Sequence, residues 1–283
     1  MGKSERFVVT MERLLGPNRV EEFRKIAELL RSRIVACGGV SGIVYMGGLV
    51  RGFADRHSDV DIIILLSERD ESLRKKIKKI GADERKRSGV DVDLEVHFLQ
   101  DFKTWKWNEM ARWDFSHSEI IFDAEGKVRK LIAKRLRVRQ SFWLKRIVVY
   151  GEYIKWYCCQ PQDNVGTIAE TWVDRGDMVS AHYCLDYALD LLIRIVYALN
   201  KEFLPPPKWE IFYSSTLKWL PSNYGRLVAD ILTVKSLSKR ELDRRLGAAR
   251  ELWREILPKI REETGLTPDL ISRQYAKHIL SQG

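Results

Sequence analysis

Residues 47–66 read GGLVRGFADRHSDVDIIILL, and this stretch is the strongest indication of the fold in the sequence. It follows a short apolar segment and begins with a glycine pair, Gly47 and Gly48. After ten further residues, Asp59 and Asp61 alternate with aliphatic residues at the start of a second apolar run. Because side chains alternate between the two faces of a β-strand, both aspartates are expected to point to one face. The stretch therefore predicts a strand, a glycine turn and a second strand that begins with two carboxylates.

These residue types favour nucleotide chemistry. Carboxylates that are held side by side repel each other, and Mg²⁺, a hard cation that prefers oxygen ligands, can neutralise them. A glycine turn leaves backbone N–H groups uncovered, which suits a phosphate group. The stretch therefore predicts a metal site beside a phosphate site.

A third acidic segment follows. Residues 90–98 read VDVDLEVHF, a strict alternation that predicts a half-buried strand. Asp91, Asp93, Glu95 and His97 share the polar face of that strand.

The ordered set resembles the DNA polymerase β-type nucleotidyltransferase superfamily. The family pattern is an apolar residue, Gly, then Gly or Ser, about ten residues, and Asp-apolar-Asp, and residues 46–48 and 59–61 fit it. The resemblance implies that Asp59, Asp61 and Asp93 are the catalytic carboxylates and hold two Mg²⁺ ions. Glu95 is the runner-up for the third position.

The same resemblance implies a nucleoside triphosphate, with ATP as the expected donor. The backbone amides of Gly47 and Gly48 are expected to grip the triphosphate. The serine that often follows the first glycine in the family is Gly48 here, so one hydroxyl contact to phosphate is lost. Further candidates for phosphate contact, with loop solubility as the alternative, are Arg51, Arg56, His57 and Ser58.

The expected fold class is α+β: a nucleotidyltransferase-type mixed sheet with flanking helices over residues 1–126, followed by an all-α helical bundle over residues 127–283. In the first domain, strands are predicted over 42–46, 60–67, 90–99 and 119–123, and helices over 18–37, 73–80 and 102–113. Asn18 and Glu21 are expected to cap the first helix as in a capping box. In the second domain, helices are predicted over 128–157, 163–172, 178–200, 209–220, 224–235 and 239–264.

The helical half is similar to that of aminoglycoside and lincosamide nucleotidyltransferases. It contains residues 172–177 (WVDRGD), a long helix and residues 207–209 (PKW). The resemblance implies that this domain binds the acceptor. A general base could come from Asp93 or Glu95, or from this domain, where His182 and Asp186 lie one helical turn apart, although a surface ion network is the favoured interpretation of that pair.

The chain of 283 residues carries a formal net charge of +10. No apolar run is long enough to span a bilayer and the first residues show no signal-peptide pattern, so a cytoplasmic protein without membrane contact is expected. Much of the positive charge lies in residues 127–146, which contain no acid. This segment is either a solvated helix face or a surface for nucleic acid or triphosphate.

The predicted function is the transfer of a nucleoside monophosphate to a hydroxyl acceptor, with a small molecule as the expected acceptor. Two alternatives stay open: the same reaction on RNA or on a protein hydroxyl, as in antitoxin-like members of the superfamily, and a non-catalytic nucleotide-binding protein. Arg175 and His182 also fit loosely the Arg-x(4–6)-His signature of HEPN ribonucleases. The sequence does not predict the oligomeric state.

Overall fold

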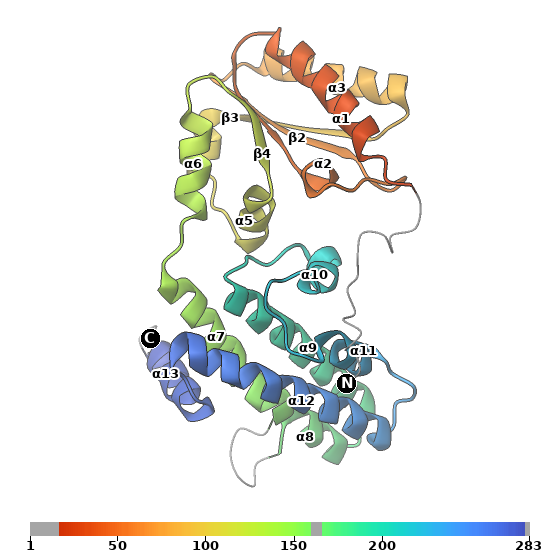
Figure 1. Ribbon diagram of the computed structural model, residues 1–283, viewed down its shortest axis with the longest axis vertical. Helices are drawn as coiled ribbons and strands as arrows, with labels where there is room; N and C mark the ends of the chain where they lie inside the picture. Colours follow the sequence, from red (N-terminus) through yellow and green to blue (C-terminus); the bar gives the residue numbers. More distant parts are fainter. Residues whose placement is uncertain (1–16, 160–165, 281–283) are drawn as a thin grey trace, which may run out of the picture. The chain divides into compact units, whose positions relative to one another are not determined.

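The structure, a computed structural model, describes residues 17–159 and 166–280, which belong to two compact units divided between Val138 and Arg139 (Figure 1). Three predictions concern residues that are not described. They are the first part of the catalytic domain, the N-terminal residues without a signal-peptide pattern, and the start of the helix 163–172. The division into a catalytic domain up to residue 126 and an acceptor-binding domain stays a prediction. The α+β fold class is confirmed.

The N-terminal unit is built on a four-stranded sheet. In chain order its elements are α1 (Val20–Val35), β1 (Val40–Tyr45), α2 (Gly47–Arg51), β2 (Val60–Leu66), α3 (Glu71–Ser88), β3 (Val92–Phe98), α4 (Leu99–Thr104), α5 (Glu109–Ser116), β4 (Glu119–Asp123) and α6 (Lys127–Leu136). The strand order is β3-β2-β1-β4. β1 is antiparallel to both β2 and β4, whereas β2 and β3 are parallel and are joined through α3.

Strand β2 is buried on both faces, which explains its continuous aliphatic run. Ile62 and Ile64 belong to a core formed with α1 and α3. Ile63 and Leu65 belong to a second core formed with α4, α5 and α6. By the same alternation, Asp61 lies on the second face of the sheet.

The glycine pair begins a short helix rather than a simple turn. Gly47 is the first residue of α2, and its φ of +59° suits glycine. The helix ends at Gly52, whose φ is +80°. The backbone therefore reverses quickly between β1 and β2 and returns to the edge at which Asp61 lies.

Two predicted helices are interrupted in the structure. The segment 102–113 divides into α4 and α5, because Trp107 leaves the helical path and stacks on Phe115, with ring centroids 4.2 Å apart. Asn108 then caps α5 by accepting a hydrogen bond from the Ala111 amide at 2.8 Å. The segment 128–157 divides at Arg137, whose extended backbone (ψ 114°) ends α6.

The C-terminal unit is helical throughout its described residues, as predicted. Its elements are α7 (Gln140–Ile154), a π-helical turn η2 (Lys155–Cys159), α8 (Ile168–Asp174), α9 (Met178–Asn200), α10 (Pro207–Ser214), α11 (Tyr224–Leu232), α12 (Lys239–Thr264) and α13 (Pro268–Leu280). The bounds of α9 and α12 match the predicted ranges, whereas α13 was not predicted. The buried side chains of α9 make it the central helix.

Among the described residues, no helix has both the length and the apolar composition needed to cross a membrane.

Candidate functional site

The three predicted carboxylates meet at one edge of the sheet. In the parallel register of β2 and β3, Asp61 stands directly opposite Asp93. Asp59 precedes β2, and its charge acts on Asp61. The sheet thus brings together side chains that lie more than thirty residues apart in sequence.

The carboxylates perturb one another in the way that a cation site requires. Burial, together with the charges of Asp59 and Asp93, raises the pKa of Asp61 to about 7, whereas the charge of Arg51 acts to lower it. Burial also raises the pKa of Asp93, with smaller contributions from neighbouring acids. Asp61 and Asp93, whose ionisation is disfavoured by burial and by nearby negative charge, would gain from a bound cation. In the described part of the chain, no three His, Cys, Asp or Glu side chains already form a metal-binding cluster.

Gly47 is in direct contact with the central carboxylate. A Cβ atom built at position 47 would overlap Oδ2 of Asp61 and lie 2.9 Å from its Cγ, closer than real contacts allow. The backbone is tied to the same residue, since the Met46 amide donates to the Asp61 carbonyl at 3.0 Å. Only glycine therefore lets the start of α2 lie against Asp61.

Gly48 is equally constrained, and this explains why the serine of the family pattern is missing. A Cβ atom at position 48 would overlap the carbonyl oxygen of Phe53. The start of α2 has no side chain that caps it. The amides of its first turn, which have no acceptor within a helix, therefore suit a phosphate.

The loop before β2 is organised by Asp55. Its Oδ1 accepts hydrogen bonds from the His57 amide at 2.8 Å and from the Ser58 hydroxyl at 3.1 Å. The Ser58 hydroxyl also accepts from the Asp55 amide at 3.0 Å, so its hydrogen bonds lie within the loop. Arg56 and His57 are exposed and contact each other, with Arg56 Nε donating to His57 Nε2 at 2.9 Å. Of the predicted phosphate-contacting side chains in this loop, Arg56 is the one that points a cation to the surface.

The charge of Arg51 acts on the central carboxylate. Its charge acts to lower the pKa of Asp61, and its guanidinium lies 5.0 Å from the ring centroid of Trp113 in α5. A cation held over an aromatic face keeps its charge while its position is fixed. Arg51 is therefore a better-placed candidate for phosphate than Ser58.

Glu95, the runner-up for the third carboxylate, is engaged elsewhere. Its Oε2 lies 3.0 Å from Nε2 of His97, and this hydrogen bond lowers the pKa of Glu95. Glu95 stands opposite Ile63 rather than opposite Asp61. The geometry therefore favours Asp93 over Glu95.

Asn18 is a supporting residue whose role the sequence did not reveal. Its Oδ1 accepts from the amides of Val20 and Ala54, both at 3.1 Å, and its Nδ2 donates to the Gly52 carbonyl at 2.9 Å. The predicted capping box with Glu21 is not formed, and the helix begins after Arg19 without a side-chain cap. Asn18 instead ties the end of α2 to the start of α1. An asparagine just before a helix is the available sequence signal, but it does not identify a partner 36 residues away.

His182 and Asp186 of α9 share a hydrogen-bond network with the buried Arg245 of α12. His182 is only 3% exposed, and its Nδ1 accepts from Arg245 Nη1 at 2.9 Å. Arg245 also donates to Asp186 and to the Ile231 carbonyl. Arg175 lies instead over the ring of Trp172, with its guanidinium 4.7 Å from the centroid. The structure therefore gives Arg175 and His182 separate partners and does not support a ribonuclease pair.

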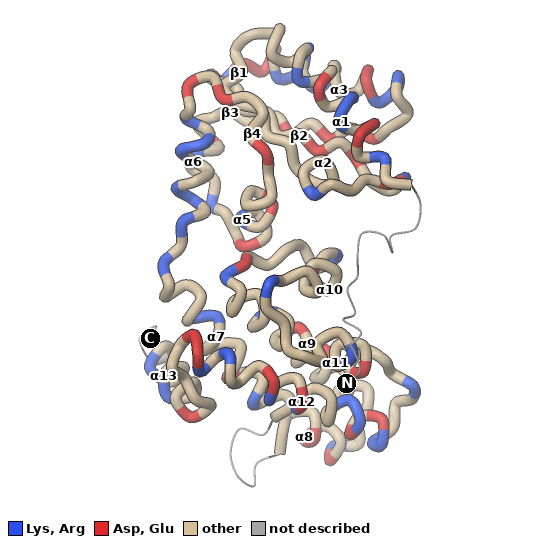
Figure 2. The backbone as a smooth tube through the Cα atoms, in the orientation of Figure 1, with Lys and Arg blue, Asp and Glu red and all other residues tan. Residues whose placement is uncertain are grey.

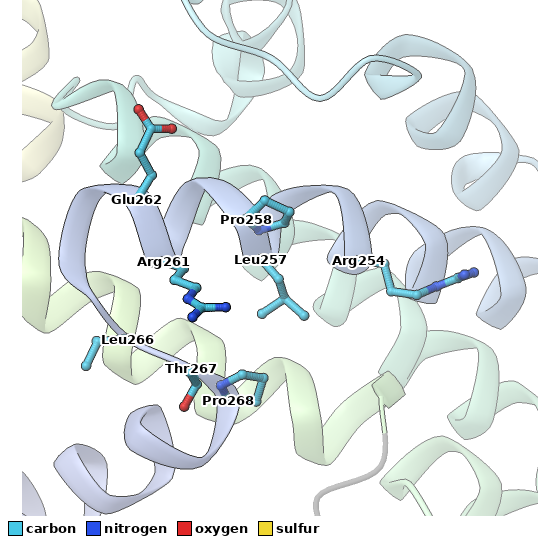
Figure 3. A pocket seen from close by; sticks show the side chains of 8 residues that line it. All are labelled: Arg254, Leu257, Pro258, Arg261, Glu262, Leu266, Thr267 and Pro268. Atoms are coloured by element: carbon cyan, nitrogen blue, oxygen red, sulfur yellow. The ribbon is translucent and has the colours of Figure 1, made fainter.

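The C-terminal unit contains a cavity of about 570 Å³ between α12 and the start of α13 (Figure 3). In Figure 3, Arg261 and Leu257 point toward Thr267 and Pro268, whereas Glu262 points away. The lining is apolar with arginines at its margin and includes Pro258, which interrupts the hydrogen bonding of α12. It contains none of the predicted site residues.

The raised pKa of Asp61 leads to a prediction for stability without divalent ions. An acid whose pKa rises from 3.8 to about 7 on folding contributes stability below pH 4, which is lost as the pH rises through 7. We expect Asp61→Asn, measured by urea denaturation with EDTA, to be more stable than the wild type at pH 8, by on the order of 2 kcal/mol. The difference should shrink toward pH 4.

The matched control for this measurement is Asp83→Asn, which changes an exposed aspartate of α3. It should leave the pH dependence of unfolding unchanged. A wild type that is more stable than Asp61→Asn at pH 8 in EDTA would contradict the assignment of charge repulsion to this site.

Comparison with known proteins identifies the N-terminal unit. Residues 23–125 match the nucleotidyltransferase domain family. No curated protein matches the chain. Among solved structures, a nucleotidyltransferase-like protein from Exiguobacterium sibiricum aligns at 14% identity and a TM-score of 0.39, over 84% of this chain and 77% of that chain.

Two further structures align with less of the chain. A toxin–antitoxin complex with AMP-PNP aligns at 18% identity and a TM-score of 0.31, over 45% of this chain and 94% of that chain. A mutant form of the MntA-HpeT toxin–antitoxin aligns at 18% identity and a TM-score of 0.30, over 44% of this chain and 92% of that chain.

Proposed function

We propose that this nucleotidyltransferase, whose nucleotidyltransferase domain spans residues 23–125, moves a nucleoside monophosphate from a nucleoside triphosphate to a hydroxyl acceptor. ATP is the expected donor. The catalytic carboxylates are Asp59, Asp61 and Asp93. The observation that carries this proposal is the register that sets Asp61 opposite Asp93, with the Gly47 backbone against the Asp61 carboxylate.

The residues of this edge fit a divalent cation. Carboxylate oxygens are the ligands that Mg²⁺ prefers, and the raised pKa of Asp61 reflects a surplus of negative charge that a cation would neutralise. Asp59 and Asp61 would hold one ion, and all three carboxylates would hold a second. Such ions would supply positive charge that stabilises the attacking and leaving oxygens of the displacement.

The remaining residues orient the triphosphate. The amides at the start of α2 bind phosphate oxygens, and the close packing of Gly47 on Asp61 keeps these amides beside the carboxylates. Arg51, held by Trp113, offers a fixed positive charge to the phosphates. Arg56 and His57 add contacts from the exposed loop.

A non-catalytic nucleotide-binding protein is the second candidate function. Such a protein needs a phosphate cradle but not a third carboxylate. The presence of Asp93 opposite Asp61, with a pKa raised by burial and by neighbouring acids, supports the catalytic candidate.

The two candidates separate in an experiment on the third carboxylate. Asp93→Asn should keep Mg²⁺-dependent binding of a non-hydrolysable ATP analogue, measured by calorimetry, within a few-fold of the wild type. It should lower nucleotidyl transfer about a hundredfold or more, because the site for the acceptor oxygen loses a ligand. Glu95→Gln is the matched control on the same strand and should retain most of the activity. Equal activity of Asp93→Asn and the wild type would refute the role of Asp93.

A further inference from the structure

Helix α6 carries an unusual amount of unbalanced charge. It contains five cations and no acid, and Figure 2 shows basic residues along it without an acidic one. Lys130 and Lys134 lie one turn apart on an exposed face of α6, and the exposed Arg137 follows directly after the helix, so we call these three cations the stripe. Like charges at this spacing destabilise a helix.

The stripe has no acidic partner in residues 17–159 and 166–280. Lys127 pairs with Glu125 at 2.6 Å, but Lys130, Lys134 and Arg137 form no ion pair with any residue that the structure describes. Arginines on other helices have nearby acids, such as Arg31 with Glu28 at 2.9 Å. Strong positive charge that is retained on one helix face therefore points to an anionic partner.

An exposed tryptophan lies on the segment that is bonded to α6. Arg135 of α6 donates hydrogen bonds to the backbone carbonyls of Lys103 and Trp105, which fixes the segment between α4 and α5 against α6. Trp105 is 39% exposed. Exposed aromatic rings and rows of cations together bind single-stranded nucleic acid, since bases stack on the ring and phosphates pair with the cations.

The Trp105 ring contacts the strand that carries Asp93. The centroid of Trp105 lies 5.5 Å from that of His97, which shares a face of β3 with Asp93. His97 is four residues beyond Asp93, and a strand rises by about 3.3 Å per residue, so roughly 13 Å separates them. A stacked nucleic-acid strand advances about 3.4 Å per nucleotide, so this distance corresponds to a few nucleotides.

We propose that the stripe Lys130, Lys134 and Arg137, together with Trp105, binds the single-stranded 3′ end of an RNA whose terminal hydroxyl is the acceptor. This proposal rests on the proposed function for its chemistry, although the binding surface stands by itself. One aromatic ring and one helix face are too narrow for a duplex, and unpaired ends are a regular feature of RNA.

The reaction balances without any further reagent. The oxygen of the terminal hydroxyl forms a bond with the α-phosphorus, and the bond from that phosphorus to the bridging oxygen breaks. Pyrophosphate leaves with that oxygen, and the hydroxyl proton is released to solvent. The RNA becomes one nucleotide longer.

The test uses the full chain and a 5′-fluorescent single-stranded RNA of twelve nucleotides. The double variant Lys130→Glu/Lys134→Glu should bind this RNA at least tenfold more weakly than the wild type by fluorescence anisotropy. The slope of log Kd against log salt concentration should fall by about 1.4, because each lost phosphate contact contributes about 0.7 to that slope. The matched control is Lys75→Glu/Lys79→Glu, two exposed lysines at the same spacing on α3, and it should bind like the wild type.

Two further arms test the aromatic ring and the acceptor. Trp105→Ala should bind the RNA about tenfold more weakly, with Trp105→Phe recovering most of the affinity. The wild type should extend RNA that ends in a 3′ hydroxyl but not RNA that ends in a 3′ phosphate. Mg²⁺–nucleotide binding, measured separately by calorimetry, should be unchanged in every surface variant.

The outcomes distinguish the surface from the catalytic site. If the wild type does not bind Mg²⁺–nucleotide, the proposed function is wrong. The anisotropy measurement would still show whether the stripe binds RNA. Equal RNA affinity in the α6 variant, the α3 control and the wild type would overturn the surface. Binding of anionic lipid vesicles in place of RNA, or equal extension of a DNA oligonucleotide, would overturn the assignment to RNA.

Discussion

Replacing Asp61 by asparagine is expected to lower nucleotidyl transfer by about a hundred- to a thousandfold while the protein stays folded. The charges of Asp59 and Asp93 both act on Asp61, which also contacts Gly47, and together with Asp59 it would bind both proposed metal ions. Asparagine keeps the size of the side chain but removes its charge, and the loss of one preorganised electrostatic partner in an active site costs about a hundred- to a thousandfold. The measurement is the initial rate of label transfer at saturating Mg²⁺ and nucleotide.

Asp83→Asn on α3 is the matched control and should retain full activity. The folded state of both variants can be checked by circular dichroism and by urea denaturation. Since Asp61→Asn is expected to be the more stable protein at pH 8 without metal, loss of its activity cannot be attributed to unfolding. Activity within tenfold of the wild type would remove Asp61 from the catalytic site.

Gly47→Ala is expected to lower the rate by about a hundredfold or more. The added methyl group would collide with Asp61 Oδ2, so either the carboxylate or the start of α2 must move. A displacement of this kind separates the phosphate-binding amides from the carboxylates. Alanine at a φ of +59° also costs roughly 1–2 kcal/mol of stability.

Gly52→Ala provides a control that separates strain from contact. Gly52 has a φ of +80°, but a Cβ atom there meets nothing within 4 Å. It should lose a similar free energy of unfolding and keep its activity within a few-fold of the wild type. Equal losses of activity in the two variants would mean that backbone strain, rather than contact with Asp61, explains the effect of Gly47→Ala.

The catalytic core was predictable because its signals are local. The alternation of residues 90–98 and the aliphatic run after Asp61 each identify a strand within a few residues, and β4 has its predicted bounds. The choice of Asp93 came only from the family resemblance. The parallel register that sets Asp93 opposite Asp61 was not predicted, because pairing between strands is not contained in either strand alone.

The features that were missed depend on distant partners. Local periodicity cannot pair residues that are far apart in sequence. Examples are the hydrogen bonds of Asn18 with Gly52 and Ala54 and the contact of Arg51 with Trp113. The break at Arg137 separates helices that belong to different units, although their apolar positions continue one helical pattern. The shift of Trp107 from helix to loop likewise depends on the aromatic cluster into which it packs.

Nucleotidyl transfer at Asp59, Asp61 and Asp93 is tested by incubating the full chain with Mg²⁺, total cellular RNA and a small-molecule extract. One reaction contains ATP labelled at the α-phosphate, and a parallel reaction contains ATP labelled at the γ-phosphate. The proposed reaction predicts that the α-label enters an acceptor, that the γ-label leaves as pyrophosphate, and that both signals vanish in Asp61→Asn. Transfer of the γ-label to the acceptor, or equal labelling by the wild type and Asp61→Asn, would contradict nucleotidyl transfer at these carboxylates.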